Sequence, residues 1–225
     1  MSLLADIAAA LGANGLIPRG SLTFDDPREA PPGPSGAPAK SVVLVGQAGA
    51  GPWPHFQRWR HRQARKLDDP LDRWSRHVIG EVAIACGARA VSPSDRPFLP
   101  FQQWAMRAEG LRPSPLGILM HPVYGLWHAY RGALLFDVAV SMEQPPEAIH
   151  LCDLCVGKPC LKSCPAGAYS ASGLAYDACL AHVRSSDGGS CRRGGCLDRN
   201  ACPHGENYRY PADVQAFHMQ AFAGL

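Results

Sequence analysis

Eight of the nine cysteines in this 225-residue chain lie between positions 152 and 202, and thiols gathered in this way are typical of metal ligands. They form two runs, one ending in Cys-Pro-Ala-Gly and the other in Cys-Pro-His-Gly. The eight cysteines are Cys152, Cys155, Cys160, Cys164, Cys179, Cys191, Cys196 and Cys202. Iron–sulfur clusters need soft thiolate ligands, four for each [4Fe–4S] cluster. The number of thiols and the two endings therefore predict two such clusters.

The ligands of the two clusters are predicted to cross between the runs. In the bacterial pattern C-x2-C-x2-C-x3-C-P, the cysteine before the proline binds the other cluster of the pair. The first cluster is then expected to be held by Cys152, Cys155, Cys160 and Cys202. The second is expected to be held by Cys164, Cys179, Cys191 and Cys196. Four residues separate Cys155 from Cys160 where the pattern has two, and the second run is looser still. The segment resembles the dicluster ferredoxin module, an electron-transfer domain that would occupy about a third of the chain.

Two other uses of the cysteines compete with the clusters. Structural zinc favours paired C-x2-C knuckles, and only Cys152 with Cys155 supplies one. A disulfide framework needs an oxidising compartment. Residues 1–16 carry no basic leader and indicate an amphipathic helix in place of an export signal. No apolar run is long enough to span a bilayer, so we expect a cytoplasmic protein, without a membrane partner, whose thiols stay reduced.

Length and charge set broader bounds. A chain of 225 residues suits one sizeable domain followed by a small one. With 22 basic and 19 acidic residues the net charge is +3, which is too balanced to indicate a nucleic-acid partner. The basic stretch 58–66 is predicted to be the solvated face of a helix.

The first half of the chain predicts alternating helices and strands, hence an α+β fold. Apolar residues at helical spacing predict a helix over 3–11. Short apolar runs predict strands over 16–24, 41–46 and 88–91. Between the first two strands, the prolines of residues 25–40 favour an extended surface segment.

The turn after the second strand is rich in small residues. Gly49 and Gly51 would let a ligand approach the backbone closely. The order is G-x-x-G-x-G and not the G-x-G-x-x-G of dinucleotide sites, so a plain tight turn remains equally open.

Three further helices are predicted to begin at prolines, each followed by a tryptophan. The pairs are Pro54 with Trp59, Pro70 with Trp74, and Pro100 with Trp104. Proline suits the first turn of a helix, and the tryptophans are expected on the buried side. Stacking of these rings on a planar cofactor is the alternative. Cys86, on the buried face of the middle helix, is predicted to be a core thiol outside the cluster set.

The segment 114–136 is the most suggestive one without cysteines. Predicted strands at 117–120 and 129–136 flank a turn dense in histidine, proline, tyrosine, glycine and tryptophan. Polar and aromatic groups at the mouth of an apolar strand pair are typical of a pocket rim. A plain hairpin with a core histidine is the alternative.

This turn is similar to the H-P-x-[FY]-G-x-W-x-A-x-R-G stretch of the CblC-type cobalamin-processing proteins. The matching residues are His121, Pro122, Tyr124, Gly125, Trp127, Ala129, Arg131 and Gly132. The resemblance implies a cobalamin site made by His121, Tyr124, Gly125, Trp127 and Arg131 with Gly49 and Gly51. In that site Trp127 would pack on the corrin, while His121 and Arg131 would donate hydrogen bonds without ligating cobalt.

A cobalamin-binding domain before a dicluster domain also resembles epoxyqueuosine reductase and the reductive dehalogenases. This implies a nitroreductase-like α/β sandwich over residues 1–145 and a ferredoxin-like domain over 146–225, with Pro145-Pro146 at the boundary. Epoxyqueuosine reductase carries further C-terminal sequence that handles tRNA and a proton-donating acid. We cannot place that acid on any residue of this chain, so tRNA modification is disfavoured.

The function predicted on this basis is that of an oxidoreductase. A soluble low-potential donor would reduce the clusters, and the clusters would reduce a bound corrinoid or another small-molecule substrate. Lys158, Lys162, Arg192 and Arg193 lie among the thiols and are expected to dock an acidic donor or to offset the charge of the clusters. Two alternatives remain open. One is a ferredoxin-type electron carrier with a structural N-terminal domain, and the other is a flavin-dependent reductase.

Overall fold

The computed structural model describes residues 2–143, 149–170 and 172–225. The chain forms two compact units, one of Met1–Gly110 with Ala129–Glu147 and one of Leu111–His128 with Ala148–Leu225. The predicted boundary at Pro145-Pro146 lies outside the described residues. The segment Leu111–His128 is grouped with the second unit, a division that the sequence did not predict.

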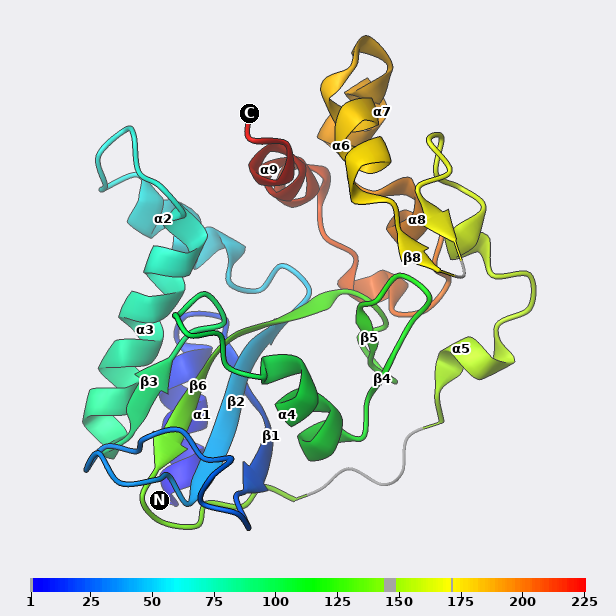
Figure 1. Cartoon of the computed structure of the whole chain (residues 1–225). Helices are drawn as coiled ribbons and strands as arrows, with labels where there is room; N and C mark the ends of the chain where they lie inside the picture. The colour runs from blue at the N-terminus through cyan, green and yellow to red at the C-terminus, as the bar shows by residue number, and fades with distance from the viewer. Residues whose placement is uncertain (1, 144–148, 171) are drawn as a thin grey trace. The chain divides into compact units, whose positions relative to one another are not determined.

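The first unit is built on a four-stranded sheet (Figure 1). The strands β1 (Ile17–Thr23), β2 (Ser41–Ala48), β6 (His128–Phe136) and β3 (Arg89–Val91) lie in the order β1-β2-β6-β3. Both outer pairs are antiparallel. Seven of the eight β2 residues are buried, as the continuous valine-rich run predicted, because helices cover both faces of the sheet. The predicted strands over 16–24, 41–46, 88–91 and 129–136 are thus confirmed.

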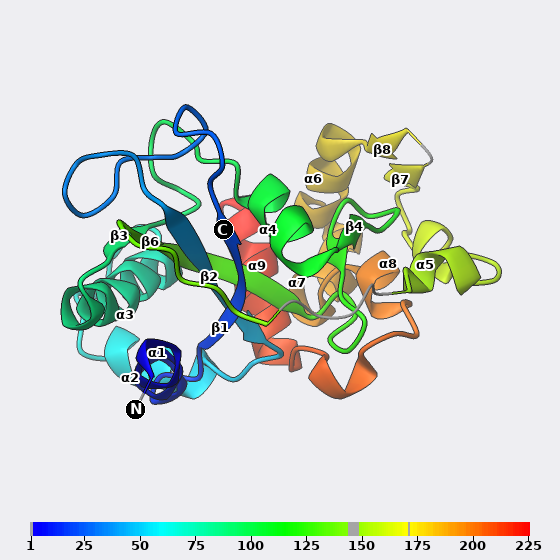
Figure 2. The same cartoon turned by 90° about the horizontal axis from the view of Figure 1, so that it is seen from below.

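The helices of this unit cover the two faces of the sheet. The helices α1 (Leu3–Gly12) and α3 (Pro70–Cys86) lie on one face, and α4 (Phe101–Glu109) lies on the other (Figure 2). The short α2 (Trp53–Arg60) packs on α3. Prolines stand at the start of all three later helices, as predicted.

The predicted burial of the three tryptophans holds for two of them. Trp74 and Trp104 are 1% and 2% exposed and belong to the core. Trp59 is only half-buried, because α2 is short and just one side of it meets α3. The prediction was therefore wrong for Trp59.

A buried polar triad ties β1, α4 and β6 together. Arg19 donates from Nε and Nη2 to Oε2 of Glu109 at 3.2 and 2.7 Å, and the Tyr130 hydroxyl donates to Oε1 at 2.8 Å. The side chains of Arg19 and Glu109 are 2% and 8% exposed. Burial, with the nearby Glu109 carboxylate, raises the pKa of Tyr130 far above its usual range. A buried ion pair satisfied in this way resists the loss of either partner.

The second unit consists of short elements. Its strand pairs are β4 (Arg112–Pro113) with β5 (Leu119–Met120), and β7 (Tyr169–Ser170) with β8 (Gly173–Leu174). The predicted strand over 117–120 is therefore shorter than expected, because Gly117 takes a positive φ of 75°.

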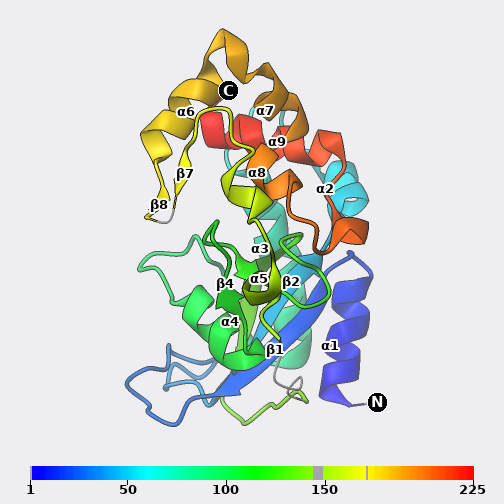
Figure 3. The ribbon, with the colours of Figure 1, turned by 90° about the vertical axis from the view of Figure 1, so that its right-hand side faces the viewer.

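The helices of the second unit fall into a larger group and several single turns. The larger helices, which lie together in Figure 3, are α6 (Tyr176–Arg184), α7 (Gly189–Gly194) and α9 (Ala212–Ala223). The single turns are α5 (Leu151–Leu154), α8 (Leu197–Asn200) and the 3-10 helices η1 (Pro159–Leu161), η2 (Ser186–Gly188) and η3 (Glu206–Tyr208).

The described part of this unit contains two small hydrophobic clusters. One combines Leu116, Met120 and Leu126 with buried cysteines, and the other combines Val183 and Ala223 with Cys191. No helix among the described residues is long and apolar enough to cross a membrane.

Candidate metal centre

Four thiols of the second unit surround one small cavity. They are Cys152, Cys155, Cys160 and Cys202. Cys152 lies in α5 and Cys160 in η1, while Cys202 comes from the loop after α8. Three of the four are buried, and Cys155 is half-buried. Met120 and Leu126 line the same cavity, so the thiols face apolar surroundings.

The surroundings of these thiols disfavour their ionisation to thiolates. Burial first, and then the neighbouring thiols of Cys202, Cys160 and Cys155, together raise the pKa of Cys152 to about 11. Burial likewise raises the pKa of Cys160 and of Cys202. Four thiolates so close together in an apolar cavity need a compensating positive charge, which is what bound metal supplies.

The other four thiols form a second group. Burial first, and then the thiols of Cys196, Cys164 and Cys191, together raise the pKa of Cys179 to about 11. The pKa values of Cys191 and Cys196 are also raised, first by burial and then by Cys164 among other charges. Cys164 accepts a hydrogen bond from the amide of Ala168 at 3.4 Å.

The structure places the eight cysteines in two groups, and their assignment as the ligands of two clusters stays a prediction. Cys202, from the second run, lies with the first three cysteines, and Cys164, from the first run, lies with the last three. Within the described residues, no three histidine, cysteine or acidic side chains converge as the ligands of a single metal ion. Around one zinc the sulfurs would be about 3.8 Å apart, from Zn–S bonds of about 2.3 Å. The four thiolates of a cubane are more widely spaced, because each binds its own iron.

Unpaired polar atoms next to the thiols also suit a bound group. Within the described part of the chain, five buried side-chain atoms have no hydrogen-bond partner, and all lie in the second unit: Trp127 Nε1, His182 Nε2, Asp198 Oδ2, Arg199 Nε and His204 Nε2. His204 lines the first cavity with its four thiols. A buried N–H left unpaired is costly, and the sulfur atoms of a cluster would accept from it. The four thiols and this imidazole are the kinds of side chain that a [4Fe–4S] cluster uses as ligands and hydrogen-bond donor.

The acidic side chain of Asp198 contributes to the raised pKa values of Cys179, Cys191 and Cys196 in the second group. Its Oδ1 accepts from the amide of Ser163 at 2.8 Å, which ties the first cysteine run to α8. Burial raises the pKa of Asp198. Sequence spacing did not single out this residue, because its contact with Ser163 joins positions 35 residues apart.

The turn predicted to hold cobalamin packs on the loop that carries Cys202. Nδ1 of His121 accepts from the amides of Val123 and Tyr124, each at 3.0 Å, and its ring stacks on Tyr124 with the centroids 4.0 Å apart. Gly125 has a φ of 57°, and the carbonyl of His204 and the amide of Gly205 occupy the space that a Cβ would need. Gly125 therefore allows the close approach of the backbone at His204 and Gly205, where the sequence analysis had expected a close approach of the corrin.

Trp127 is likewise covered by protein. It is fully buried, and the ring of Tyr210 meets it edge-on with the ring centroids 5.4 Å apart. The guanidinium carbon of Arg199 lies 4.4 Å from the centroid of the Trp127 ring. Arg199 also donates to the carbonyl of Leu126 at 2.6 Å. These contacts give Trp127 a packing role that the sequence did not predict.

The remaining predicted cofactor residues lie in the first unit. Arg131 donates from Nε to Oε1 of Gln47 at 2.8 Å, and Nε2 of Gln47 donates to the carbonyl of Gly49 at 2.9 Å. Gly51 packs against the backbone of Gly15. The structure therefore joins Arg131 to the glycine turn through Gln47, which the sequence had not singled out. The assignment of the seven residues to a cobalamin site stays a prediction.

Cys86 lies at the end of α3, outside both thiol groups. It is half-buried and not the fully buried core thiol that was predicted, because it stands in the last, partly exposed turn of the helix. Burial still raises its pKa.

Comparison with known proteins gives matches only at the level of structure. No protein-family model matches the chain, and no curated protein matches it. Epoxyqueuosine reductase from Bacillus subtilis, with its catalytic loop swung out of the active site, is 14% identical, with a TM-score of 0.51, over 92% of this chain and 67% of that chain. The enzyme from Streptococcus thermophilus is 14% identical with a TM-score of 0.48, over 79% and 52%. A third structure, the reductase with an epoxyqueuosine-modified tRNA stem loop, is 14% identical with a TM-score of 0.49, over 92% and 66%.

The match to the Bacillus subtilis enzyme shows a shared mixed α and β fold, and it confirms the predicted fold class at that level. The chain covers only about half to two thirds of the length of these neighbours. The nitroreductase-like and ferredoxin-like descriptions of the two parts stay predictions.

Proposed function

We propose that this protein is an iron–sulfur oxidoreductase that holds two [4Fe–4S] clusters in its second unit. The observation that carries the proposal is the gathering of eight thiols into two groups of four, with Cys202 and Cys164 exchanged between the runs. Bound there, the clusters would accept and release single electrons at low potential. The fold shared with a reductase agrees with this role.

The cations near the thiols divide into two kinds. Lys158 donates to the carbonyl of Cys152, and Arg192 donates to the carbonyls of Val183 and Ser185, so these two hold the ligand loops. Lys162 and Arg193 are exposed. We assign docking of an acidic, low-potential electron donor to Lys162 and Arg193, since exposed charge chiefly accelerates encounter.

Residues next to the thiols would tune the first cluster. His204 is oriented by the backbone contact of its carbonyl with Gly125 and lines the thiol cavity. In the tautomer protonated at Nε2, its ring would donate a hydrogen bond to a cluster sulfur. Such a bond stabilises the more negative, reduced state and thereby raises the reduction potential.

The acceptor that we propose is a corrinoid. The support is the similarity of the segment 121–132 to the CblC-type stretch, together with the Gln47-mediated contact between Arg131 and Gly49. Arg131 would donate to the amide arms or the phosphate of the corrinoid, and the glycine turn would let it approach. If no corrinoid binds and the clusters pass their electrons to a partner protein, the chain would be a ferredoxin-type electron carrier.

Two measurements on anaerobically purified, full-length protein test the proposal. Iron and sulfide analysis should give about eight of each per chain, the sum for two cubanes. Zinc without sulfide, even after reconstitution, would refute the cluster assignment.

Titration of the cluster-replete protein with hydroxocobalamin should change the visible spectrum. Arg131→Ala should weaken the change, and Arg28→Ala, which removes an exposed arginine from a local pair with Asp26, should not. Cluster-replete protein that binds no cobalamin would favour the electron carrier.

The prediction of no nucleic-acid partner rests on balanced charge alone, and one structural neighbour is a complex with a tRNA stem loop. A parallel titration with such an RNA tests that prediction.

A further inference from the structure

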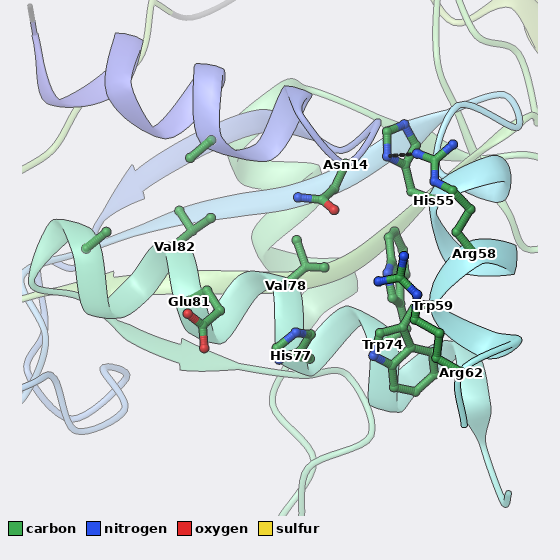
Figure 4. Close-up of a pocket in the computed structure, with 12 residues that line it drawn as sticks. Asn14, His55, Arg58, Trp59, Arg62, Trp74, His77, Val78, Glu81 and Val82 are labelled. Atoms are coloured by element: carbon green, nitrogen blue, oxygen red, sulfur yellow. Dashed lines mark hydrogen bonds between the residues drawn. The ribbon is translucent and has the colours of Figure 1, made fainter. Parts of the chain in front are cut away.

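A groove of about 420 Å³ lies between α1, α2 and α3 in the first unit (Figure 4). It is separate from the thiol groups and from the residues assigned to the corrinoid. Its size falls in the range of small-molecule sites, which is about 300 to 1,000 Å³. Val78 and Val82 of α3 contribute apolar surface, and the polar residues lie around it.

One end of the groove is positively charged. Arg58 lies in α2, and Arg62 lies two residues after the end of this helix. His77 faces the two arginines from α3 (Figure 4). Nη2 of Arg58 lies 3.0 Å from Nδ1 of His55. In the parts of the chain that the structure describes, neither arginine forms an ion pair with an acidic side chain.

Other exposed arginines of the same unit do have acidic partners. Arg76 pairs with Asp95 at 3.2 Å, and Arg107 pairs with Glu29 at 3.1 Å. Uncompensated guanidinium groups at one end of a groove form a site for an anion, and phosphate suits them because it accepts parallel hydrogen bonds.

Trp59 provides a flat surface beside these arginines. It is the half-exposed tryptophan of the three, and Phe56 stacks behind it with the ring centroids 6.5 Å apart and the planes at 28°. A planar ring in the groove can therefore stack on Trp59. The exposed Glu81, farther along α3, and the half-exposed Asn14, which follows α1, offer acceptors for N–H groups (Figure 4).

We propose that this groove binds a phosphorylated ligand of mononucleotide size. The phosphate lies on Arg58 and Arg62, and the planar base stacks on Trp59. The edge of the base donates to Glu81. The arginines recognise the phosphate dianion, Trp59 recognises the planar ring, and Glu81 recognises the hydrogen-bond donors of the base. Binding of this ligand does not depend on the clusters.

Titration of the full-length, cluster-replete protein with AMP and GMP tests the proposal, with ribose 5-phosphate and inorganic phosphate as ring-free probes. Calorimetry should show saturable binding of a mononucleotide, and tryptophan fluorescence should be quenched. Ribose 5-phosphate should bind more weakly, because it cannot stack. Arg62→Gln should weaken nucleotide binding about tenfold, since a charge-assisted contact to phosphate is lost. Trp59→Leu should weaken binding of the nucleotides and leave that of ribose 5-phosphate unchanged.

The matched control is Arg65→Gln, which removes an exposed arginine of the same segment that does not line the groove. It should bind nucleotides like the unmodified protein. Equal weakening by Arg62→Gln and Arg65→Gln would show non-specific attraction and overturn the proposal, as would the absence of saturable binding. A single-stranded RNA that binds far more tightly than any mononucleotide, with a steep salt dependence, would also overturn it and identify an RNA surface.

Discussion

The two units of this chain are stabilised in different ways. In the first, β2 is almost entirely buried between helices, and the triad of Arg19, Glu109 and Tyr130 is satisfied by protein atoms alone. In the second, the four strands that form pairs are two residues each, and both hydrophobic clusters contain cysteines. Hairpins this short do not support a fold by themselves. On the proposed cluster assignment, bound metal would therefore contribute to the fold of the second unit and not to that of the first.

The largest expected effect is that of removing the metal. Chelation of iron under oxidising conditions should unfold much of the second unit, because binding energy of the metal is folding energy there. Hydrogen exchange of the full chain should show lost protection in α6, α7 and α9 and retained protection in β2. Equal protection of both units in the metal-free protein would contradict the comparison.

A second prediction concerns the buried triad. Glu109→Ala removes the carboxylate that compensates the buried charge of Arg19, and it should lower the free energy of unfolding of the first unit by about 3–5 kcal/mol. Urea denaturation followed by hydrogen exchange measures the loss, and iron content should not change. The control is Glu29→Ala, whose pair with Arg107 is 59% and 47% exposed. It should cost at most about 1 kcal/mol. Loss of iron from the Glu109 variant would mean that the two units are not independent.

A third prediction compares two glycines of the second unit that both have positive φ. Gly125→Ala places a methyl group against the backbone of His204 and Gly205, whereas at Gly117 there is no atom within 4 Å of a Cβ. Backbone strain of about 1 kcal/mol is common to both variants. The clash adds to it only at Gly125, so we expect that variant alone to lose iron from the first group. Equal iron retention in the two variants would remove the proposed support of the Cys202 loop by the turn.

The smallest expected effect is electronic. His204→Leu should leave the iron content unchanged and make the midpoint potential of one cluster more negative, because a hydrogen bond to sulfur is lost. A redox titration followed by electron paramagnetic resonance measures this shift. The control is His61→Leu, which removes an exposed histidine of the first unit and should leave both potentials unchanged. An unaltered potential in the His204 variant would show that its ring does not donate to the cluster.

Local patterns predicted the parts of the fold that depend on local physics. The run Ser41–Gly46 predicted a buried strand because its residues are continuously apolar, and the two Cys-Pro endings predicted the crossed partition of the thiols. The exposure of Trp59 was missed, since helical spacing alone does not tell how much of a short helix is covered. The cationic groove was missed as well, because the stretch 58–66 had been interpreted as a solvated face.

Contacts between positions far apart in the chain could not be predicted from the sequence. Gly125 packs on His204, and Gln47 joins Arg131 to Gly49, although nothing in the spacing of these residues links them. The turn around His121 could be selected from its composition, but its packing on the Cys202 loop could not. Tertiary contacts of this kind depend on which loops the fold brings together.

The crossed ligation is tested most directly by double replacement of cysteines. Single variants Cys152→Ala, Cys202→Ala and Cys164→Ala should each retain about four iron, the content of one cubane. Cys152→Ala with Cys202→Ala should lose no more than either alone, because both thiols serve the first cluster, whereas Cys152→Ala with Cys164→Ala should lose both clusters. Cys86→Ala should retain about eight iron. If the Cys152 and Cys202 replacements together abolish both clusters, while those of Cys152 and Cys164 spare one, the crossed assignment is contradicted.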